Sequence, residues 1–201
     1  STANCDYTDP LALHAIKMVK NDLVESYNGD MEKRASMHNA QCLAGMAFSN
    51  ALLGIVHSMA HKTGAAFSTG HITHGCANAM YLPYVIKYNA RDAVAAHRYA
   101  EIARRMGLVG TSEQALINSL CEKIDDFNVQ MNIPKSLKEF GIIEDEFKEK
   151  IAKIFIIMII YISYKFFTFT DREMERSNFL SETLSQILYY IFKGCIVNIH
   201  F

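Results

Sequence analysis

The sequence has little of what marks several large classes of protein. Only 3 of its 201 residues are proline and 10 are glycine, while half are apolar and the formal net charge is −1. Disordered chains combine low hydrophobicity with high net charge, and nucleic-acid-binding domains are strongly basic. The composition therefore excludes a disordered chain and predicts no nucleic-acid partner. A chain of this length is expected to fold as one domain with a sizeable core.

The cysteines are few and form no Cys-x-x-Cys pair. The five are Cys5, Cys42, Cys76, Cys121 and Cys195. Scattered cysteines are typical of reduced thiols in an intracellular protein, rather than of a disulfide framework or a cysteine zinc site. No charged-then-apolar signal peptide opens the chain, so we predict a cytoplasmic protein. The chain begins at Ser1 without an initiator methionine, which indicates a processed product or a piece of something longer.

Motifs for phosphate binding are missing as well. The sequence contains neither a Gly-x-Gly-x-x-Gly turn after a strand nor a phosphate loop with Gly-Lys-Ser/Thr, and both are signatures of nucleotide-binding units. Strand-like alternation of apolar and polar residues never persists for more than a few positions. The fold class predicted from these patterns is all-α, without a nucleotide-binding unit of its own.

What the sequence does have is a series of helical patterns. Thr8-Asp9-Pro10 starts a first helix and Asn28-Gly29-Asp30 ends it, because the first motif caps a helix and the second breaks one. A second, longer helix is predicted from about Met31 to His61, with a stop at Lys62-Thr63-Gly64. Small residues in its middle favour tight packing against neighbouring helices.

Helical patterns continue beyond residue 76. Residues 77–88 are apolar, and Pro83 within them should kink or break a helix. Residues 90–106 continue the helical character. The capping-box patterns Thr111–Gln114 and Ser136–Glu139 introduce two later segments, and Gly141 is expected to end the second.

The end of the chain differs from the rest. Residues 151–170 are crowded with Ile, Phe and Tyr, and the apolar core of this segment, 154–164, has 11 residues. A membrane-spanning helix needs about 20, which argues against a membrane span, yet this composition also makes a poor buried helix. Both interpretations stay open. We divide the chain into a helical domain, residues 1–150, and a diverged or anomalous tail, residues 151–201.

Four of the eight histidines lie within the stretch from Gly54 to Gly75. Imidazole is well suited to bind a transition metal or to relay a proton at neutral pH. His57 and His61 are four residues apart and share one face of a helix. His71 and His74 follow in what we predict to be a glycine-flanked loop, so the four could converge on zinc or iron.

The spacing of His57 and His61 is that of a zinc-protease helix, but Ser58 stands where such a helix carries its catalytic Glu. The protease interpretation therefore fails. The isolated histidines His14, His38, His97 and His200 are assigned no role.

Residues 44–90 closely resemble the iron-containing alcohol dehydrogenase family. The signature of that family is G-x-x-H-x-x-A-H-x-x-G, followed after a short loop by Pro-His-Gly and an Ala-Asn-Ala helix. The matching residues here are Gly54, His57, Ala60, His61, Gly64, His74-Gly75 and Ala77-Asn78-Ala79. Weaker resemblance extends back to Tyr7 and forward to about Phe147.

The resemblance implies a dehydroquinate-synthase-like architecture of two domains. An amino-terminal α/β domain binds NAD or NADP, and an all-helical carboxy-terminal domain holds most of the metal site. Members hold one Fe²⁺, or zinc in some cases, with an Asp, a His four residues later and the two signature histidines. By position, His57 and His74 are metal ligands, and His61 lies at the nicotinamide end of the cofactor as a proton relay. His71 falls where members vary and is expected to support the metal ligands from behind or to line the pocket.

The chain departs from the family pattern in several places. The Asp-x-x-x-His segment would lie just before Ser1, so two of the four ligands and the nucleotide domain are expected to be absent from this chain. Thr73 replaces the usual proline before His74, which should loosen the loop. The family's Asp-x-Cys-Thr-x-x-Asn-Pro-Arg segment has no counterpart in residues 151–178.

That last departure suggests a hypothesis about the tail. The run 154–169 has the composition that AT-rich non-coding DNA encodes when it is translated, so the hypothesis is that part of this tail is a translated intron or a gene-model error. The alternative is a genuinely diverged helix, and sequencing the transcript across this region decides between them.

Two functions follow from the sequence. The first, implied by the resemblance, is an NAD(P)-dependent oxidoreductase in which a metal assists hydride transfer between a primary alcohol or aldehyde and a nicotinamide. We expect this chain alone to be inactive. The second is a non-catalytic helical metal-binding or assembly module. Apolar helical faces lacking a partner domain would favour a homo-oligomer.

Overall fold

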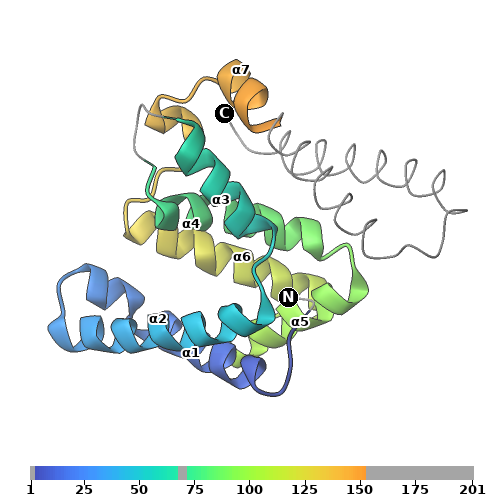
Figure 1. Cartoon of the computed structure of the whole chain (residues 1–201). Helices are drawn as coiled ribbons and strands as arrows, with labels where there is room; N and C mark the ends of the chain where they lie inside the picture. The colour runs from blue at the N-terminus through green and yellow to red at the C-terminus, as the bar shows by residue number, and fades with distance from the viewer. Residues whose placement is uncertain (1–2, 68–71, 153–201) are drawn as a thin grey trace, which may run out of the picture.

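The chain is all-α throughout the part that the structure, a computed structural model, describes (Figure 1). The described residues are 3–67 and 72–152. The predicted fold class is confirmed, since the described residues contain no strand. In chain order the elements are α1 (Thr8–Tyr27), α2 (Met31–Ala51), α3 (Ile55–Ala66), α4 (His74–Asn89), α5 (Ala93–Arg105), α6 (Glu113–Gln130), the 3-10 turn η1 (Leu137–Phe140), α7 (Glu144–Phe147) and the π-helical turn η2 (Lys148–Ala152).

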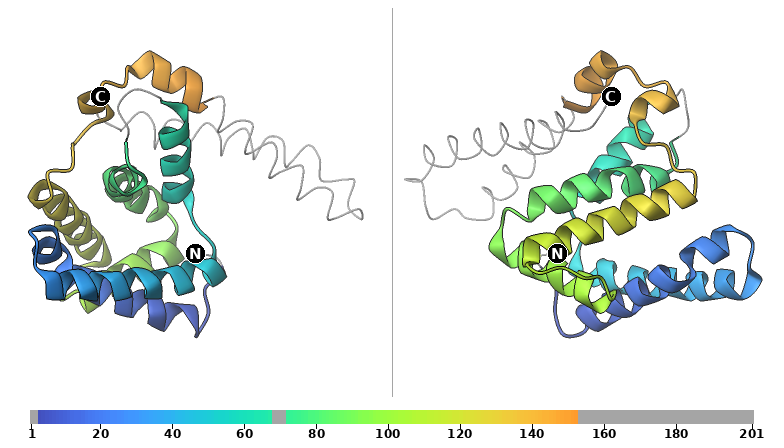
Figure 2. Two further views of the ribbon diagram at one scale, coloured as in Figure 1. Left: turned by 60° about the vertical axis from the view of Figure 1, so that its left-hand side comes forward. Right: turned by 180° about the vertical axis from the view of Figure 1, so that it is seen from behind.

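Helices α1 and α2 form an antiparallel hairpin and lie side by side in every view (Figures 1 and 2). The turn is built as the sequence predicts: Gly29 has a φ of +103°, and the carboxylate of Asp30 accepts from the backbone N–H groups of Glu32 and Lys33 at 2.9 and 3.0 Å. Asp22 of α1 then accepts from Lys33 Nζ at 2.7 Å. A capped turn and a partly buried ion pair fix the hairpin.

The prediction of one long helix from about Met31 to His61 is wrong. Helix α2 ends at Ala51 and α3 begins at Ile55, and the two axes differ by 105°. Leu52 makes the turn with φ 67° and ψ 165°, a conformation found almost only in glycine. Apolar residues continue through the break, so periodicity gave no sign of it.

Pro83 lies inside α4 without ending it, where a kink or a break was predicted. Proline has no N–H, so the carbonyl of Ala79 four residues earlier loses its helical partner. Asn128 of α6 supplies a replacement, because its Nδ2 donates to the Ala79 oxygen at 3.1 Å. A side chain of a neighbouring helix thus repairs the hydrogen-bond ladder.

The later helices begin with side-chain caps. The Asp92 carboxylate accepts from the backbone N–H of Ala95 at 2.9 Å, and the Ser112 hydroxyl accepts from that of Ala115 at 3.1 Å. The cap of α6 is therefore one residue later than the predicted box. Gly141 ends the short turn η1 with a φ of +79°, as predicted.

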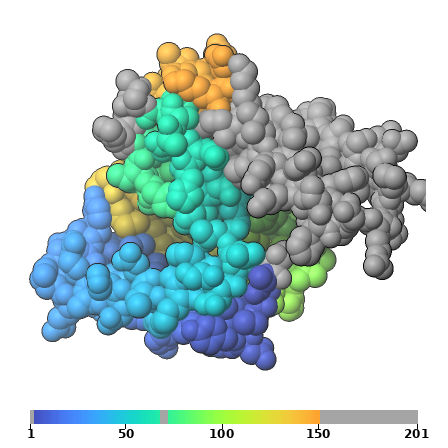
Figure 3. Space-filling view, viewed as in Figure 1, coloured from blue at the N-terminus to red at the C-terminus, as the bar shows by residue number. Residues whose placement is uncertain are grey.

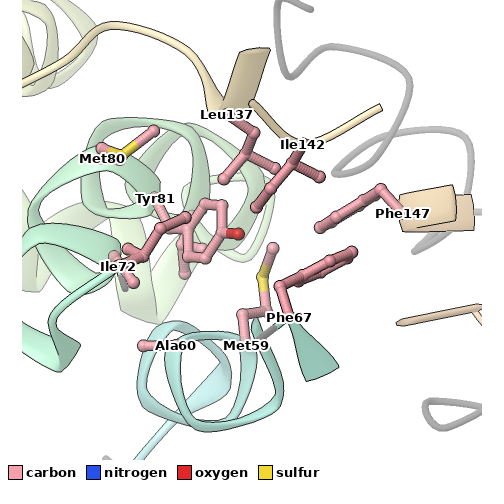
Figure 4. Close-up of a cluster of buried hydrophobic side chains, with 11 residues drawn as sticks. Met59, Ala60, Phe67, Ile72, Met80, Tyr81, Leu137, Ile142 and Phe147 are labelled. Carbon is pink, nitrogen blue, oxygen red and sulfur yellow. The ribbon is translucent and has the colours of Figure 1, made fainter. Parts of the chain in front are cut away.

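Two clusters of buried apolar side chains form the core. One lies among α4, α5 and α6, and the other joins α3 and α4 to the segment from Leu137 to Phe147. In the second cluster the rings of Phe67 and Phe147 stack with centroids 6.2 Å apart (Figure 4). This packing holds α3 against α4, and these two helices carry the clustered histidines.

Two predictions concern membranes and the tail. Among residues 3–67 and 72–152, no individual helix combines the length and apolarity that crossing a bilayer requires; α2 and α3 reach that level only together, across their bend. The apolar run at 154–169 lies outside the described residues. The division of the chain near residue 150 stays a prediction.

Candidate metal centre

His57 and His61 lie on one face of α3, as their spacing predicts, with ring centroids 4.7 Å apart. His74 is not in a loop, contrary to the prediction, because it is the first residue of α4. Since α3 and α4 pack together, the first residue of α4 lies against the side of α3. His71 lies outside the described residues.

His57, His61 and His74 form a compact cluster. His57 Nε2 and His74 Nε2 are 3.1 Å apart. The ring of His74 lies 4.4 Å from each of the other two rings, centroid to centroid. One ring nitrogen from each residue lies within 4.8 Å of the other two. Residues 17 positions apart in sequence are thus brought to one point by the packing of α3 on α4.

Thr73 places His74 at the start of α4. Its hydroxyl accepts from the backbone N–H of Cys76 at 3.4 Å, and its carbonyl accepts from Ala77 at 3.0 Å. Thr73 was expected to loosen this segment because it stands in place of a proline. The structure corrects that expectation, since the threonine caps the helix that carries His74.

A buried pair of hydroxyl groups joins α3 to α4 behind the histidines. Thr63 Oγ1 donates to the carbonyl of Met59 at 2.9 Å and lies 2.8 Å from the hydroxyl oxygen of Tyr81. Burial raises the pKa of Tyr81 to about 12, so the phenol keeps its proton. The helix stop predicted at Lys62-Thr63-Gly64 is wrong, because α3 continues to Ala66. Polar core residues such as Thr63 carry no periodic signal that would reveal them.

The environment of His57 favours the neutral imidazole. Burial lowers the pKa of His57, and the proximity of His74 and His61 lowers it further. A neutral imidazole keeps the lone pair that a metal ion or a proton requires. His57 is half-buried, whereas His61 and His74 are exposed, so a bound molecule could approach from their side.

An apolar surface borders the cluster on the side of α2. The ring of Phe48 lies 6.1 Å from the ring of His57, centroid to centroid, and Leu52 and Leu53 in the turn are both exposed. The end of α2 and the start of α3 meet on the face seen in Figure 3. Phe48 was not among the predicted site residues, because the break that brings it to His57 is invisible in the sequence.

Among residues 3–67 and 72–152, the group that could hold a metal does not include the isolated histidines His14, His38 and His97. His97 of α5 is exposed and pairs with Glu113 through Nδ1 at 2.7 Å, while His200 lies outside the described residues. No role was predicted for either.

Comparison with known proteins identifies the family. The sequence model described as "Fe-containing alcohol dehydrogenase family, C-terminal" matches residues 1–174. The chain belongs to this family. The resemblance seen in the sequence is therefore confirmed, and the described helices belong to the carboxy-terminal part of the family's fold.

Individual relatives agree with this assignment. Over 154 residues the chain is 56% identical to an NADPH-dependent butanol dehydrogenase of Clostridium saccharobutylicum, covering 77% of this chain and 38% of the relative. An aldehyde-alcohol dehydrogenase of Streptococcus pneumoniae is 43% identical over 162 residues, covering 74% of this chain and 18% of the relative. The chain thus spans well under half the length of the curated relatives it matches.

Solved structures of other enzymes are also similar to this chain. A 1,3-propanediol oxidoreductase superposes with a TM-score of 0.68 at 32% identity, covering 76% of this chain and 40% of the other. An alcohol dehydrogenase from Oenococcus oeni gives a TM-score of 0.66 at 28% identity, covering 94% and 47%.

Proposed function

We propose that this chain is the metal-holding helical part of an NAD(P)-dependent oxidoreductase that interconverts a primary alcohol and its aldehyde. The observation that carries the proposal is the convergence of His57, His61 and His74 at the contact of α3 with α4. The names of the relatives, which are alcohol and aldehyde-alcohol dehydrogenases, support the reaction class.

The donor atoms fit a divalent iron or zinc ion. Neutral imidazoles are preferred ligands of both ions. Two nitrogens bound tetrahedrally at about 2.0–2.1 Å lie about 3.3 Å apart, and the Nε2 atoms of His57 and His74 are 3.1 Å apart. His57 and His74 would hold the ion, which when bound would act as a Lewis acid on the substrate oxygen.

The remaining role belongs to His61. Its ring lies one helical turn from His57 on an exposed face, where it can accept the alcohol proton and pass it to water. The nicotinamide cofactor, NAD or NADP, would be bound by the dinucleotide domain that the resemblance implies. Which of the two it is depends on that domain.

A chimaera tests the proposal. The corresponding part of the Clostridium butanol dehydrogenase would be replaced by this chain, and butanol-dependent reduction of NADP⁺ measured. We expect the chimaera to turn over butanol. Chelation should remove this activity and added iron or zinc should restore it. His57→Gln should abolish it, while the exposed His97→Gln should leave it unchanged. Turnover that survives both chelation and His57→Gln would contradict the proposal.

The chain alone is expected to be inactive. Two imidazoles fill only half of a tetrahedral ion's positions, and the cofactor domain is not among the described helices. Purified chain with added iron, NADP⁺ and butanol should therefore give no turnover, and measurable turnover would contradict this.

The second candidate, a helical metal-binding or assembly module without catalysis, draws on the same histidine cluster. It predicts that a folded, metal-loaded chimaera stays inactive. A small alcohol or aldehyde as substrate, a cytoplasmic location and a homo-oligomer stay predictions. Measuring the molar mass of the chain in solution checks the last.

A further inference from the structure

The turn between α2 and α3 has a conformation that its own sequence disfavours. It consists of Leu52, Leu53 and Gly54, and the chain bends there by 105° (Figure 1). Leucine is among the best helix formers, yet Leu52 has a φ of 67°, which is costly in any residue but glycine. Helix α3 begins after Gly54 without a side-chain cap. The local preference for helix therefore conflicts with the turn that the fold imposes.

The segment before this turn is attached to the rest of the molecule by few contacts. The hairpin of α1 and α2 packs mainly on itself, along one side of the molecule (Figure 2). Among the described helices outside the hairpin, α1 meets α5 most closely. Ile16, Leu23 and Val24 of α1 pack against the buried cluster of α4, α5 and α6. Arg98 Nη1 of α5 lies 3.5 Å from Asp9 Oδ2 of α1.

A helical turn at residues 52–54 would separate the hairpin from its own α5. Helices α2 and α3 would then form one helix from Met31 to Ala66, the continuous helix that the sequence favours. The surface left open on α5 fits the hairpin of a second copy, because the residues on both sides are the same in every copy. Short connections under strain favour this kind of exchange.

We propose that the turn at Leu52 is the hinge of a domain-swapped dimer, in which two copies of this chain exchange their α1–α2 hairpins. The contacts of α1 with α5 are kept, but each joins two copies. The dimer gains an unstrained Leu52 and the main-chain hydrogen bonds of a helix through residues 52–54. It loses the independent motion of two molecules, so it forms at high protein concentration.

The exchange changes one border of the histidine cluster and leaves the cluster itself in place. Helices α3 and α4 keep their packing, so His57 and His74 stay together. Phe48, whose ring centroid is 6.1 Å from that of His57, would lie nine residues away on the same straight helix, a rise of about 14 Å. The swapped dimer therefore lacks the apolar surface that borders His57 in the monomer. The inference is independent of any bound metal.

Two glycine substitutions test the hinge in the purified 201-residue chain. Gly54 has a φ of −102° and open space around its missing Cβ, so alanine fits the monomer, but it favours helix and hence the dimer. Gly45→Ala is the matched control. Gly45 also has open space and lies within α2, so it is helical in both forms. Each protein is refolded from urea at low and high concentration, and light scattering after size exclusion gives its molar mass.

We expect Gly54→Ala to lower the dissociation constant of the dimer at least about fivefold, and Gly45→Ala to leave it unchanged. Leu52→Gly should raise the dissociation constant, because glycine removes the strain from the monomer and weakens the continuous helix. A wild-type chain and a Gly54→Ala variant that both stay monomeric at every concentration would overturn the inference. Equal effects of Gly54→Ala and Gly45→Ala would also overturn it.

Cross-linking distinguishes exchange from simple side-by-side association. One chain carries Asp9→Cys and a second carries Arg98→Cys, and the two are refolded together and treated with a short bismaleimide. The native cysteines replaced by serine in both chains are Cys5, Cys42, Cys76 and Cys195. A swapped dimer places position 9 of one copy beside position 98 of the other, so a covalent dimer is expected. A dimer that gives no such product associates in another way, and the inference is then wrong.

Discussion

At the scale of single residues, the histidine cluster depends on the environment of His57. The fold lowers the pKa of this imidazole, first by burial and then through His74 and His61. The folded, metal-free chain therefore binds fewer protons at His57 than the unfolded chain does, in the pH range between the lowered pKa and the ordinary value of about 6.5.

The first prediction is a loss of stability on acidification. The free energy of unfolding should fall as the pH drops through about 6.5 and level off below the lowered pKa of folded His57. Urea unfolding about one pH unit above and about one unit below 6.5 measures the change. The His57→Gln variant should lose less of its free energy of unfolding on acidification than the wild type does. Equal losses in the variant and the wild type would show that His57 is not the cause.

A second prediction at this scale concerns the hydroxyl pair between α3 and α4. Tyr81→Phe removes one hydrogen bond but leaves the Thr63 hydroxyl bonded to Met59, so it should cost about 1 kcal/mol. Thr63→Val leaves the buried Tyr81 hydroxyl without its partner and should cost more, about 1–3 kcal/mol. Urea unfolding gives both values, and the reverse order would contradict the assignment.

At the scale of elements, the break between α2 and α3 decides where the histidines lie. A continuous helix would carry His57 and His61 along the axis of α2 and away from His74. The chain instead turns by 105° at a strained leucine. Such conformations cost about 1–3 kcal/mol in residues other than glycine.

Replacing that leucine with glycine should therefore stabilise the protein. Leu52 is 65% exposed, so little packing is lost, and relief of strain outweighs the entropy cost of glycine, about 0.5–1 kcal/mol. We expect Leu52→Gly to raise the free energy of unfolding by about 1 kcal/mol. Leu53→Gly, at an exposed neighbour with ordinary φ, should lower it, and a loss in both variants would argue against strain at Leu52.

The bond from Asn128 to Ala79 predicts a coupling between two helices. Asn128→Ala should cost about 1–3 kcal/mol, because the Ala79 carbonyl opposite Pro83 would lose its donor. In a Pro83→Ala background the new N–H at position 83 can serve that carbonyl, so the same change should cost less. A double-mutant cycle by urea unfolding measures this coupling, and additive effects would contradict it.

At the scale of the whole molecule, local signals predicted much of the fold. Gly29 marks the end of α1, and the side chains of Asp30 and Ser112 cap the starts of α2 and α6, each within a few residues. The break at Leu52 and the path of α4 through Pro83 could not be predicted, because distant packing and the Asn128 bond decide them.

The candidate site likewise combines features that the sequence predicts with features that it does not. The pairing of His57 with His61 follows from helical spacing alone. The arrival of His74 beside them, and of Phe48 against His57, depends on the contact of α3 with α4 and on the turn at Leu52. Those contacts are set by tertiary packing, which a single sequence does not display.

The central claim is that histidines of α3 and α4 share one metal ion. Anomalous X-ray diffraction at the zinc edge, from crystals of the zinc-loaded chain, tests it most directly. The account predicts one strong peak within bonding distance of the ring nitrogens of His57 and His74. A zinc-loaded chain whose only peak lies elsewhere, or whose His57 and His74 point away from it, would contradict the account.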